Sequence, residues 1–353
     1  MKKIKIGIIG CGRVSEHYKK LLLSKKITNY IVLAVCDINL NKAKLLSSHF
    51  KCDYYNSINK MLKNTNFDLI FLLTPSGYHY KQAKYIISKK INVLIEKPTA
   101  FFPNEIKKIS TLAKKNQVIA CTAYQNRFNP AVQFLKKNID NGNFGKIVSS
   151  SVRLRWCRYN AYYNDEWHGT WKMDGGVINQ QAIHHIDCIS WILGPINKVC
   201  SIATKRLNKL EAEDTLVSIV EFKNKSLGTI EATTAARPRD FEASISIVGE
   251  KGIIEIGGIG LNKIEKCEFV KGNKNFAYIK KKYSENIENG YGNSHIILIN
   301  KIIKNILNKK IASPVPVETT IKTCEFVNAL YKSNEINKWV KVGGNNLSKQ
   351  LGK

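Results

Sequence analysis

Apolar runs and amphipathic stretches alternate along the first third of the chain. Each run has the length of one buried strand, and the runs occupy residues 4–9, 31–36, 68–73, 91–95 and 118–122. Stretches with helical periodicity follow three of them and end near residues 23, 50 and 89. Strands that alternate with helices predict a parallel, doubly wound sheet of the Rossmann type, whose ligands bind at the carboxyl ends of the strands.

The later part of the chain has the pattern of successive strands joined by short turns. Strands are expected at residues 199–204, 215–222, 228–234, 242–248 and 252–256, and closing helices at 293–310 and 318–333. Such a series forms a large open, mostly antiparallel sheet with helices on one face. The other face needs cover, so we expect a homodimer or homotetramer built on residues 199–256.

The length of 353 residues exceeds what one hydrophobic core usually supports. We therefore predict two domains. Residues 1–123 form an α/β Rossmann domain that binds a dinucleotide. Residues 124–353 form an α+β domain for substrate binding and oligomerisation.

Composition narrows the class of protein. The longest apolar runs are too short to cross a bilayer, and the first strand begins too early for a signal peptide. We therefore expect a cytoplasmic protein without a membrane partner. The nine cysteines are scattered with no C-x-x-C pair, which indicates reduced thiols and neither a disulfide framework nor a metal site.

The formal net charge of +29 suggests a nucleic-acid partner at first sight. Only eight of the 56 basic residues are arginine, however, and the lysines are spread along the whole chain. This distribution indicates general compositional drift rather than a groove-binding surface, so we expect no nucleic-acid partner. A small acidic substrate suits the positive field better.

A glycine loop follows the first strand and precedes the first helix. Its sequence is Gly10-Cys-Gly12-Arg-Val-Ser15, in which Gly10 permits a tight turn and Gly12 lets a pyrophosphate approach the helix N-terminus. Asp37 ends the second strand, 25 residues past Gly12. A carboxylate there binds the adenine ribose hydroxyls and repels a 2′-phosphate, which favours NAD over NADP. The alternative is that Asp37 caps the helix at 39–50.

Two further loops fall at strand ends, Thr74-Pro75 with His79, and Glu96-Lys97-Pro98. With the glycine loop and Asp37, in this order and spacing, they resemble the Gfo/Idh/MocA family of oxidoreductases. In that family the lysine of Glu-Lys-Pro lies beside the nicotinamide and the substrate hydroxyl. The resemblance implies that NAD is bound by Gly10, Gly12, Arg13, Val14, Ser15, Asp37, Thr74, Pro75, His79, Glu96, Lys97 and Gln125.

The segment from Asp174 to about Leu193 is expected to form one helix, which Gly194-Pro195 ends. A stripe of apolar residues from Ile178 to Leu193 defines its buried face. Gln180, His184, Asp187 and Trp191 fall on the opposite, polar face, whereas His185 lies near the apolar stripe. The periodicity therefore favours His184 over His185 as the functional histidine.

His184 also matches the second motif of the family, Asp-x-x-x-His, with Gln180 in place of the aspartate. The surrounding residues resemble the branch that oxidises carbon 3 of UDP-N-acetylglucosaminuronic acid or UDP-N-acetylglucosamine for surface polysaccharides. This implies substrate contacts from Lys97, Arg155, Arg158, Tyr163, Trp167, Trp171, Asn179, Gln180 and His184. For the arginines, simple alternation along a strand is an equal alternative, because 153 and 155 share a face.

The implied reaction transfers a hydride from carbon 3 to NAD while a base takes the hydroxyl proton. Histidine titrates near neutral pH, so His184 is the better base, and Lys97 then steadies the developing alkoxide. Which residue moves the proton stays open, as does recycling of NADH by 2-oxoglutarate. The alternatives are a dehydrogenase or reductase of another sugar or polyol, and a non-catalytic regulator that senses nicotinamide cofactors. The regulator would need neither Lys97 nor His184.

Overall fold

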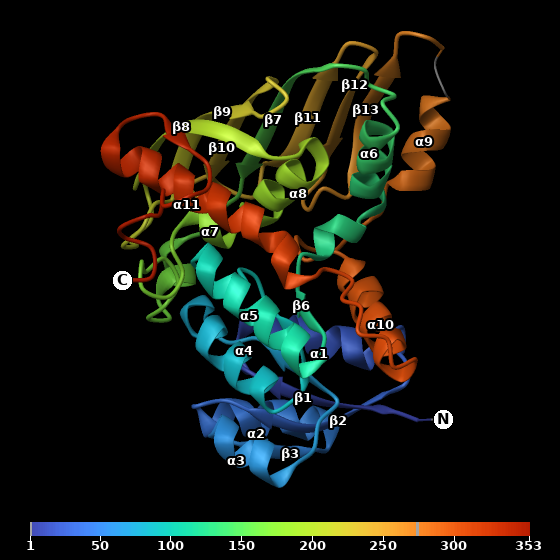
Figure 1. The fold of residues 1–353 in the computed structure, drawn as a ribbon, viewed down its shortest axis with the longest axis vertical. Helices are drawn as coiled ribbons and strands as arrows, with labels where there is room; N and C mark the ends of the chain where they lie inside the picture. Colours follow the sequence, from blue (N-terminus) through green and yellow to red (C-terminus); the bar gives the residue numbers. More distant parts are fainter. Residues whose placement is uncertain (1, 273–274) are drawn as a thin grey trace. The chain divides into compact units, whose positions relative to one another are not determined.

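The computed structural model describes residues 2–272 and 275–353, which form two compact units (Figure 1). Unit 1 combines Met1–Tyr124 with His295–Ile321, and unit 2 combines Gln125–Ser294 with Lys322–Lys353. Among the described helices, none is long and apolar enough to cross a membrane.

Unit 1 is built on a parallel sheet of six strands in the described chain, in the order β3-β2-β1-β4-β5-β6. The strands are β1 (Ile4–Ile9), β2 (Tyr30–Cys36), β3 (Asp53–Tyr55), β4 (Leu69–Leu72), β5 (Asn92–Ile95) and β6 (Ala120–Thr122). The helices are α1 (Arg13–Leu23), α2 (Leu40–Phe50), α3 (Ile58–Asn64), α4 (His79–Ser88), α5 (Pro103–Asn116) and α10 (Ser294–Leu307), with 3₁₀ turns η1 (Ser76–Tyr78) and η4 (Val317–Thr320). The central strand β4 is wholly buried, as its unbroken apolar run requires. The predicted Rossmann sheet is confirmed.

Unit 2 is built on a sheet of eight strands within the described residues, in the order β13-β12-β11-β7-β10-β9-β8-β14. The strands are β7 (Ile147–Arg155), β8 (Ile196–Thr204), β9 (Thr215–Phe222), β10 (Leu227–Thr233), β11 (Glu242–Gly249), β12 (Gly252–Gly257), β13 (Lys263–Phe269) and β14 (Val340–Lys341). The helices are α6 (Pro130–Asp140), α7 (Val177–Gln180), α8 (Ile183–Leu193), α9 (Phe276–Tyr283) and α11 (Ile321–Ile336), with 3₁₀ turns η2 (Gln125–Phe128) and η3 (Asn160–Tyr163). Among the described strands of this sheet only β7 and β10 pair in parallel, so the predicted mostly antiparallel sheet is confirmed.

Helix α10 is part of unit 1, although it follows most of unit 2 in sequence. Asn300 Nδ2 donates a hydrogen bond of 2.9 Å to the Lys26 carbonyl oxygen, and α10 buries Leu298, Ile299 and Ile302 completely. The sequence analysis assigned everything after residue 123 to the second domain. The sequence of α10 does not indicate which unit the helix belongs to, because its apolar stripe can pack against either unit.

One face of the eight-stranded sheet carries exposed apolar side chains. Ile202 is 73% exposed, Val217 52% and Ile219 51%. Ile202 and Val217 are direct partners in the β8–β9 ladder, so they point to the same side of the sheet. Leu227 and Val248 continue this row on β10 and β11 through their partner Ser149. We call these five residues the open face.

The predicted helix from Asp174 to Leu193 is in fact two helices, α7 and α8. Gly175 has φ of +77°, which a helix cannot include, and Gly176 is extended. Glu213 then accepts the first two N–H groups, with its carbonyl oxygen 3.0 Å from Val177 N and its carboxylate 3.1 Å from Ile178 N. The helix therefore begins at Val177, three residues later than expected.

Asp187 does not belong to an open polar face, which corrects a second expectation. Its carboxylate is 1% exposed and accepts two hydrogen bonds of 2.7 Å from Arg127 Nε and Nη2. Thr323 Oγ1 donates a third, also of 2.7 Å. In α8 only His184 and Trp191 are left partly exposed.

We expect Asp187→Ala to lower the free energy of unfolding by about 3–5 kcal/mol, because Arg127 would stay buried without its anion. Urea denaturation measures the loss. Asp140→Ala is the matched control, since its pair with Lys136 is exposed and worth less than about 1 kcal/mol. Equal losses in the two variants would contradict a dominant role for the buried pair.

Candidate active site

Four loops meet at the carboxyl edge of the parallel sheet of unit 1. Strands β2, β1, β4 and β5 are neighbours in that sheet, and each leads into one predicted site segment. These segments are Asp37, the glycine loop, Thr74-Pro75 and Glu96-Lys97. The topology therefore brings together residues that are far apart in sequence, at the edge where ligands bind in such sheets.

The glycine loop has the geometry that a dinucleotide needs. Gly10 has φ of +97°, and a Cβ atom there would lie 2.6 Å from the Leu73 backbone, so only glycine fits. Gly12 is the N-cap of α1, and a Cβ atom there would meet nothing within 4 Å. Open space therefore lies at the N-terminus of an eleven-residue helix, where a pyrophosphate would bind. Ser15 is buried and donates from Oγ to the Gly12 carbonyl oxygen at 2.6 Å.

Asp37 is held in place by backbone donors at the end of β2. Its carboxylate accepts from Cys11 N at 2.7 Å and from Asn39 N at 2.8 Å. The N-cap of α2 is Asn39, whose side chain accepts from Asn41 and Lys42. Asp37 is therefore not the cap of that helix, and the half-buried carboxylate stands beside the glycine loop as a ribose-binding residue requires.

His79 connects the two remaining loops instead of pointing into solvent. It is 1% exposed, with Nε2 2.8 Å from the Thr74 carbonyl oxygen and Nδ1 2.7 Å from the Pro98 carbonyl oxygen. Thr74 Oγ1 donates to Gln82 Oε1 at 2.6 Å. These contacts support the shape of the cofactor loops. Arg13 is exposed and Val14 half-buried at the start of α1.

Glu96 and Lys97 differ sharply in exposure. Glu96 is 6% exposed and accepts a hydrogen bond of 2.8 Å from the Tyr18 hydroxyl. Burial alone would raise its pKa, but the neighbouring His295, Lys97 and Tyr18 outweigh burial and lower the pKa of Glu96 to about 2. Glu96 is therefore an anion under all ordinary conditions. Lys97 is half-buried at the carboxyl edge.

In unit 2, α8 separates the two adjacent histidines as the helix periodicity predicts. His185 is 1% exposed, and within the described residues its ring nitrogens have no hydrogen-bond partner. Burial lowers the pKa of His185 to about 3, so the ring is neutral. Its nearest ring is that of Trp156, at 6.5 Å between centroids. His184 lies half-exposed on the other side of the helix.

Asn179 and Gln180 lie on α7 and are nearly buried, at 2% and 7% exposure. Asn179 Nδ2 donates to the Asp174 carbonyl oxygen at 2.5 Å. The buried Glu213 holds the start of this helix, and Tyr331 Oη donates to Glu213 Oε1 at 3.0 Å. Burial raises the pKa of Glu213 to about 7. Gly176 is required here, because a Cβ atom would lie 2.1 Å from Glu213 oxygens.

The two interpretations of the arginines were contact with the substrate and simple alternation along a strand. Arg155 lies on the same side of the sheet as the open face, where Glu231 binds Nε and Nη2 at 2.6 Å each and Glu242 binds Nη1 at 2.9 Å. These cross-strand ion pairs favour the structural role. Arg158 lies over the rings of Trp156 and Tyr162, at 5.0 and 5.7 Å from their centroids, and pairs with one carboxylate, that of Asp240, at 3.0 Å.

Aromatic residues gather in the segment before α7. Tyr162 and Tyr163 contact each other at 5.0 Å between centroids, and Trp167 stacks on His168 at 3.6 Å. Tyr163 hydrogen-bonds Thr234 Oγ1 at 2.8 Å, whereas Trp171 lies edge-on against Tyr331. Gln125 is 1% exposed in η2. Partly exposed rings of this kind suit stacking on a base or a sugar face.

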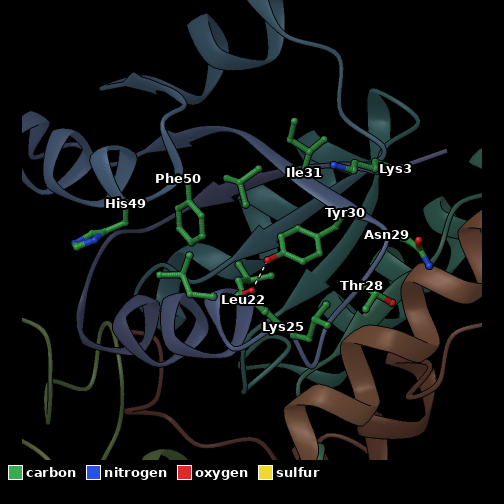
Figure 2. Close-up of a pocket in the computed structure, with 12 residues that line it drawn as sticks. Lys3, Leu22, Lys25, Thr28, Asn29, Tyr30, Ile31, His49 and Phe50 are labelled. Carbon is green, nitrogen blue, oxygen red and sulfur yellow. Dashed lines mark hydrogen bonds between the residues drawn. The ribbon is translucent and has the colours of Figure 1, made fainter. Parts of the chain in front are cut away.

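A hollow in unit 1 lies at the opposite edge of the sheet from the four loops (Figure 2). It is lined by the start of β2 and the ends of α1 and α2, including Tyr30, Leu22, His49 and Phe50. The Tyr30 hydroxyl donates to the Leu22 carbonyl oxygen beside it. The amino edge of a parallel sheet carries no cofactor loops, so this hollow is separate from the candidate site.

Two residues near the candidate site were missed by sequence reasoning. Arg127 and Glu213 act through partners 60 and 35 residues away. His295, which the sequence offered with Tyr291 as a residue that could approach the active site, lies beside Glu96. No spacing rule connects such positions. Within the described residues, no group of three or more His, Cys, Asp or Glu side chains is arranged to hold a metal ion.

Known proteins share this architecture over nearly the whole chain. The WlbA dehydrogenase of Bordetella pertussis, solved with NADH and UDP-GlcNAcA, is 28% identical with a TM-score of 0.91, covering 98% of this chain and 99% of that one. The WlbA dehydrogenase of Chromobacterium violaceum, with the same two ligands, is 28% identical with a TM-score of 0.89 and 97% coverage of both chains. The D-glucoside 3-dehydrogenase of Escherichia coli is 23% identical over 271 residues, which span 70% of this chain and 75% of that protein.

The family comparison covers both units. Residues 4–124 match the oxidoreductase family's NAD-binding Rossmann fold, and residues 136–342 match its C-terminal alpha/beta domain. The cofactor is therefore NAD, in agreement with the open helix N-terminus at Gly12 and the placement of Asp37. The chain belongs to the Gfo/Idh/MocA family of oxidoreductases.

Proposed function

We propose that this enzyme oxidises the C3 hydroxyl of a UDP-N-acetyl amino sugar or its uronic acid, with NAD as the oxidant, during cytoplasmic nucleotide-sugar synthesis for a surface polysaccharide. The observation that carries the proposal is the likeness over 97–98% of the chain to two dehydrogenases bound to NADH and UDP-GlcNAcA. Relatives of lower coverage are named for glucosides and inositols, so a free sugar or polyol is the second candidate.

The chain supplies the groups that the reaction needs. NAD, when bound, accepts the hydride from carbon 3. His184 is the half-exposed histidine of α8, so it can take the hydroxyl proton and pass it to solvent. Lys97 presents a cation at the carboxyl edge, where it steadies the alkoxide as the proton leaves. Asn179 and Gln180 offer amides to sugar hydroxyls.

A nucleotide sugar also needs binding groups for its diphosphate, its base and, in the uronic acid, a carboxylate. Arg158 lies beside the rings of Trp156 and Tyr162 and has one carboxylate partner in the described chain, Asp240, so its guanidinium group keeps donors for phosphate or carboxylate oxygens. Tyr163, Trp167 and Trp171 supply rings for stacking. Arg155 is engaged by two carboxylates, so we assign it to the sheet and not to the substrate.

A screen of nucleotide sugars and free sugars tests the substrate class. We expect absorbance of NADH to appear with UDP-N-acetylglucosaminuronic acid or UDP-N-acetylglucosamine, and not with glucose or inositol. Parallel runs with 2-oxoglutarate detect internal recycling of NADH. The reaction rate with NADP should be much lower than the rate with NAD, because the Asp37 carboxylate repels a 2′-phosphate. Asp37→Ala should reduce this difference between the two rates. Activity on free sugars alone would refute the nucleotide-sugar assignment.

The catalytic assignment predicts a contrast between the adjacent histidines. Lys97→Met and His184→Ala should each lower turnover by roughly 100-fold or more, the usual effect of removing an acid–base or electrostatic group. NAD binding and thermal stability should change little. His185→Ala should instead destabilise the fold by about 1–3 kcal/mol and affect turnover less, because that ring is buried.

Steady-state kinetics and thermal melts on the same three variants separate these effects. The two histidines are neighbours in sequence, so each serves as the control for the other. Normal turnover in His184→Ala combined with lost turnover in His185→Ala would refute the assignment.

We also propose that two copies pair through the open face. Ile202, Val217, Ile219, Leu227 and Val248 form an apolar row across four strands, which is unusual for a surface that stays in water. The ion pairs of Arg155 with Glu231 and Glu242 lie on the same side and would border the interface. A sheet face of this kind is self-complementary around a two-fold axis.

Light scattering should therefore find a dimer or tetramer at micromolar concentration. Ile219→Lys should raise the dissociation constant at least tenfold, because an ammonium would be buried against apolar side chains. Leu45→Lys on α2 is the control, since Leu45 is 64% exposed in the other unit. A monomeric unmodified protein would contradict the proposal.

A further inference from the structure

Four side chains of unit 1 form a buried cluster that the proposed mechanism does not use. Tyr18 and His17 lie on α1, Glu96 follows β5, and His295 lies on α10. The Tyr18 hydroxyl donates to Glu96 Oε1 at 2.8 Å, and His295 Nε2 lies 3.9 Å from the same oxygen. His295 Nδ1 lies 3.3 Å from His17 Nε2. We call these four residues the Glu96 cluster.

The cluster is almost closed to water. Tyr18 is fully buried, His295 is 1% exposed and Glu96 is 6% exposed. A carboxylate in such surroundings is stable only with several donors or a cation beside it. His295 and Tyr18 come from two helices that are far apart in sequence. Two helices, α1 and α10, therefore each place a side chain beside this one carboxylate.

The second oxygen of this carboxylate connects the cluster to the active-site lysine. Glu96 Oε2 accepts a hydrogen bond of 3.1 Å from the backbone N–H of Lys97. Tyr18 thus donates a hydrogen bond to one oxygen of Glu96, with His295 facing the same oxygen at ion-pair distance, and the other oxygen accepts from the peptide from which the Lys97 side chain begins. If Glu96 turned, this peptide would lose its acceptor.

His17 completes the arrangement on the side away from Glu96. Burial, together with the neighbouring His295, lowers the pKa of His17 to about 3, so His17 is neutral. A neutral imidazole can accept a hydrogen bond at Nε2, which lets the facing Nδ1 of His295 donate. His295 is then oriented with Nε2 towards Glu96. The ring planes of the two histidines are inclined by 67°.

We propose that His295 is a positioning residue for Lys97, acting through Glu96. It neither touches the reacting atoms nor carries the proton. It fixes the carboxylate that fixes the Lys97 backbone, and so it sets where the lysine cation lies at the carboxyl edge. The role of Lys97 in turnover rests on the proposed function, whereas its backbone contact does not.

Two isosteric substitutions separate the contacts of His295. Glutamine places an amide nitrogen near the position of Nε2, so His295→Gln keeps the donor to Glu96. Asparagine reaches only the position of Nδ1, so His295→Asn keeps the contact with His17 and loses the one with Glu96. His49→Asn, at an exposed histidine of α2, is the control for the substitution itself.

The first readout is amide hydrogen exchange of Lys97 in the unliganded protein. We expect roughly tenfold faster exchange in His295→Asn and unchanged exchange in His295→Gln and His49→Asn. Tyr18→Phe, which removes one hydroxyl from the cluster, should give a smaller increase of roughly threefold. The exchange measurement needs no substrate, so it tests the contact of the Lys97 backbone even if the proposed reaction is wrong. Unchanged Lys97 exchange in His295→Asn would overturn the proposal, whatever Tyr18→Phe shows.

The second readout is steady-state kinetics. His295→Asn should lower kcat by roughly 10- to 100-fold, the usual effect of a displaced catalytic group, while KM changes little. His295→Gln should restore kcat to within about threefold of the unmodified enzyme. If His295→Gln is as impaired as His295→Asn, an amide donor at this position does not position Lys97, and the positioning role is refuted.

Discussion

The buried ion pair between Arg127 and Asp187 determines how the second unit presents its chemistry. Asp187 lies one helical turn after His184 on α8, and Arg127 holds it through two hydrogen bonds. Thr323 adds a third contact from α11. A helix anchored at one carboxylate from two directions cannot rotate about its axis. The same constraint that buries Asp187 therefore turns His184 outwards and His185 into the core.

A second constraint acts in the first unit and comes from topology rather than from a single pair. Parallel strands place all their carboxyl ends at one edge, so the glycine loop, Asp37, Thr74 and Glu96 meet there although they are far apart in sequence. Local contacts then set the details. Cys11 N–H orients Asp37, and His79 connects the Thr74 loop to Pro98. Asp37 and the Thr74 loop are thus each held by hydrogen bonds from neighbouring segments.

The parts of this structure that sequence could predict are those with local causes. Strand runs, the glycine loop and the exposure of His184 follow from periodicity within about ten residues. The start of α7 could not be predicted in this way, because Glu213 supplies the acceptors for its first N–H groups from 35 residues away. Asp187 was expected on a polar face because local periodicity does not reveal its partner Arg127, which is 60 residues distant. The return of α10 to unit 1 depends on contacts across nearly the whole chain.

Two buried glutamates, one in each unit, show how burial and partners together determine the charge of a carboxyl group. Glu96 and Glu213 are exposed by 6% and 3%. Glu96 has a hydroxyl donor and cationic neighbours, which hold its pKa at about 2. For Glu213 burial prevails over its donors, and the neighbouring Asp214 adds to it, so its pKa rises to about 7. The permanent anion accepts from the backbone N–H of Lys97, the residue that we propose steadies the alkoxide. Glu213 is partly protonated near neutral pH and holds the start of the helix that carries Asn179 and Gln180. The side-chain amides of these two residues are neutral, so they need no charged group beside them.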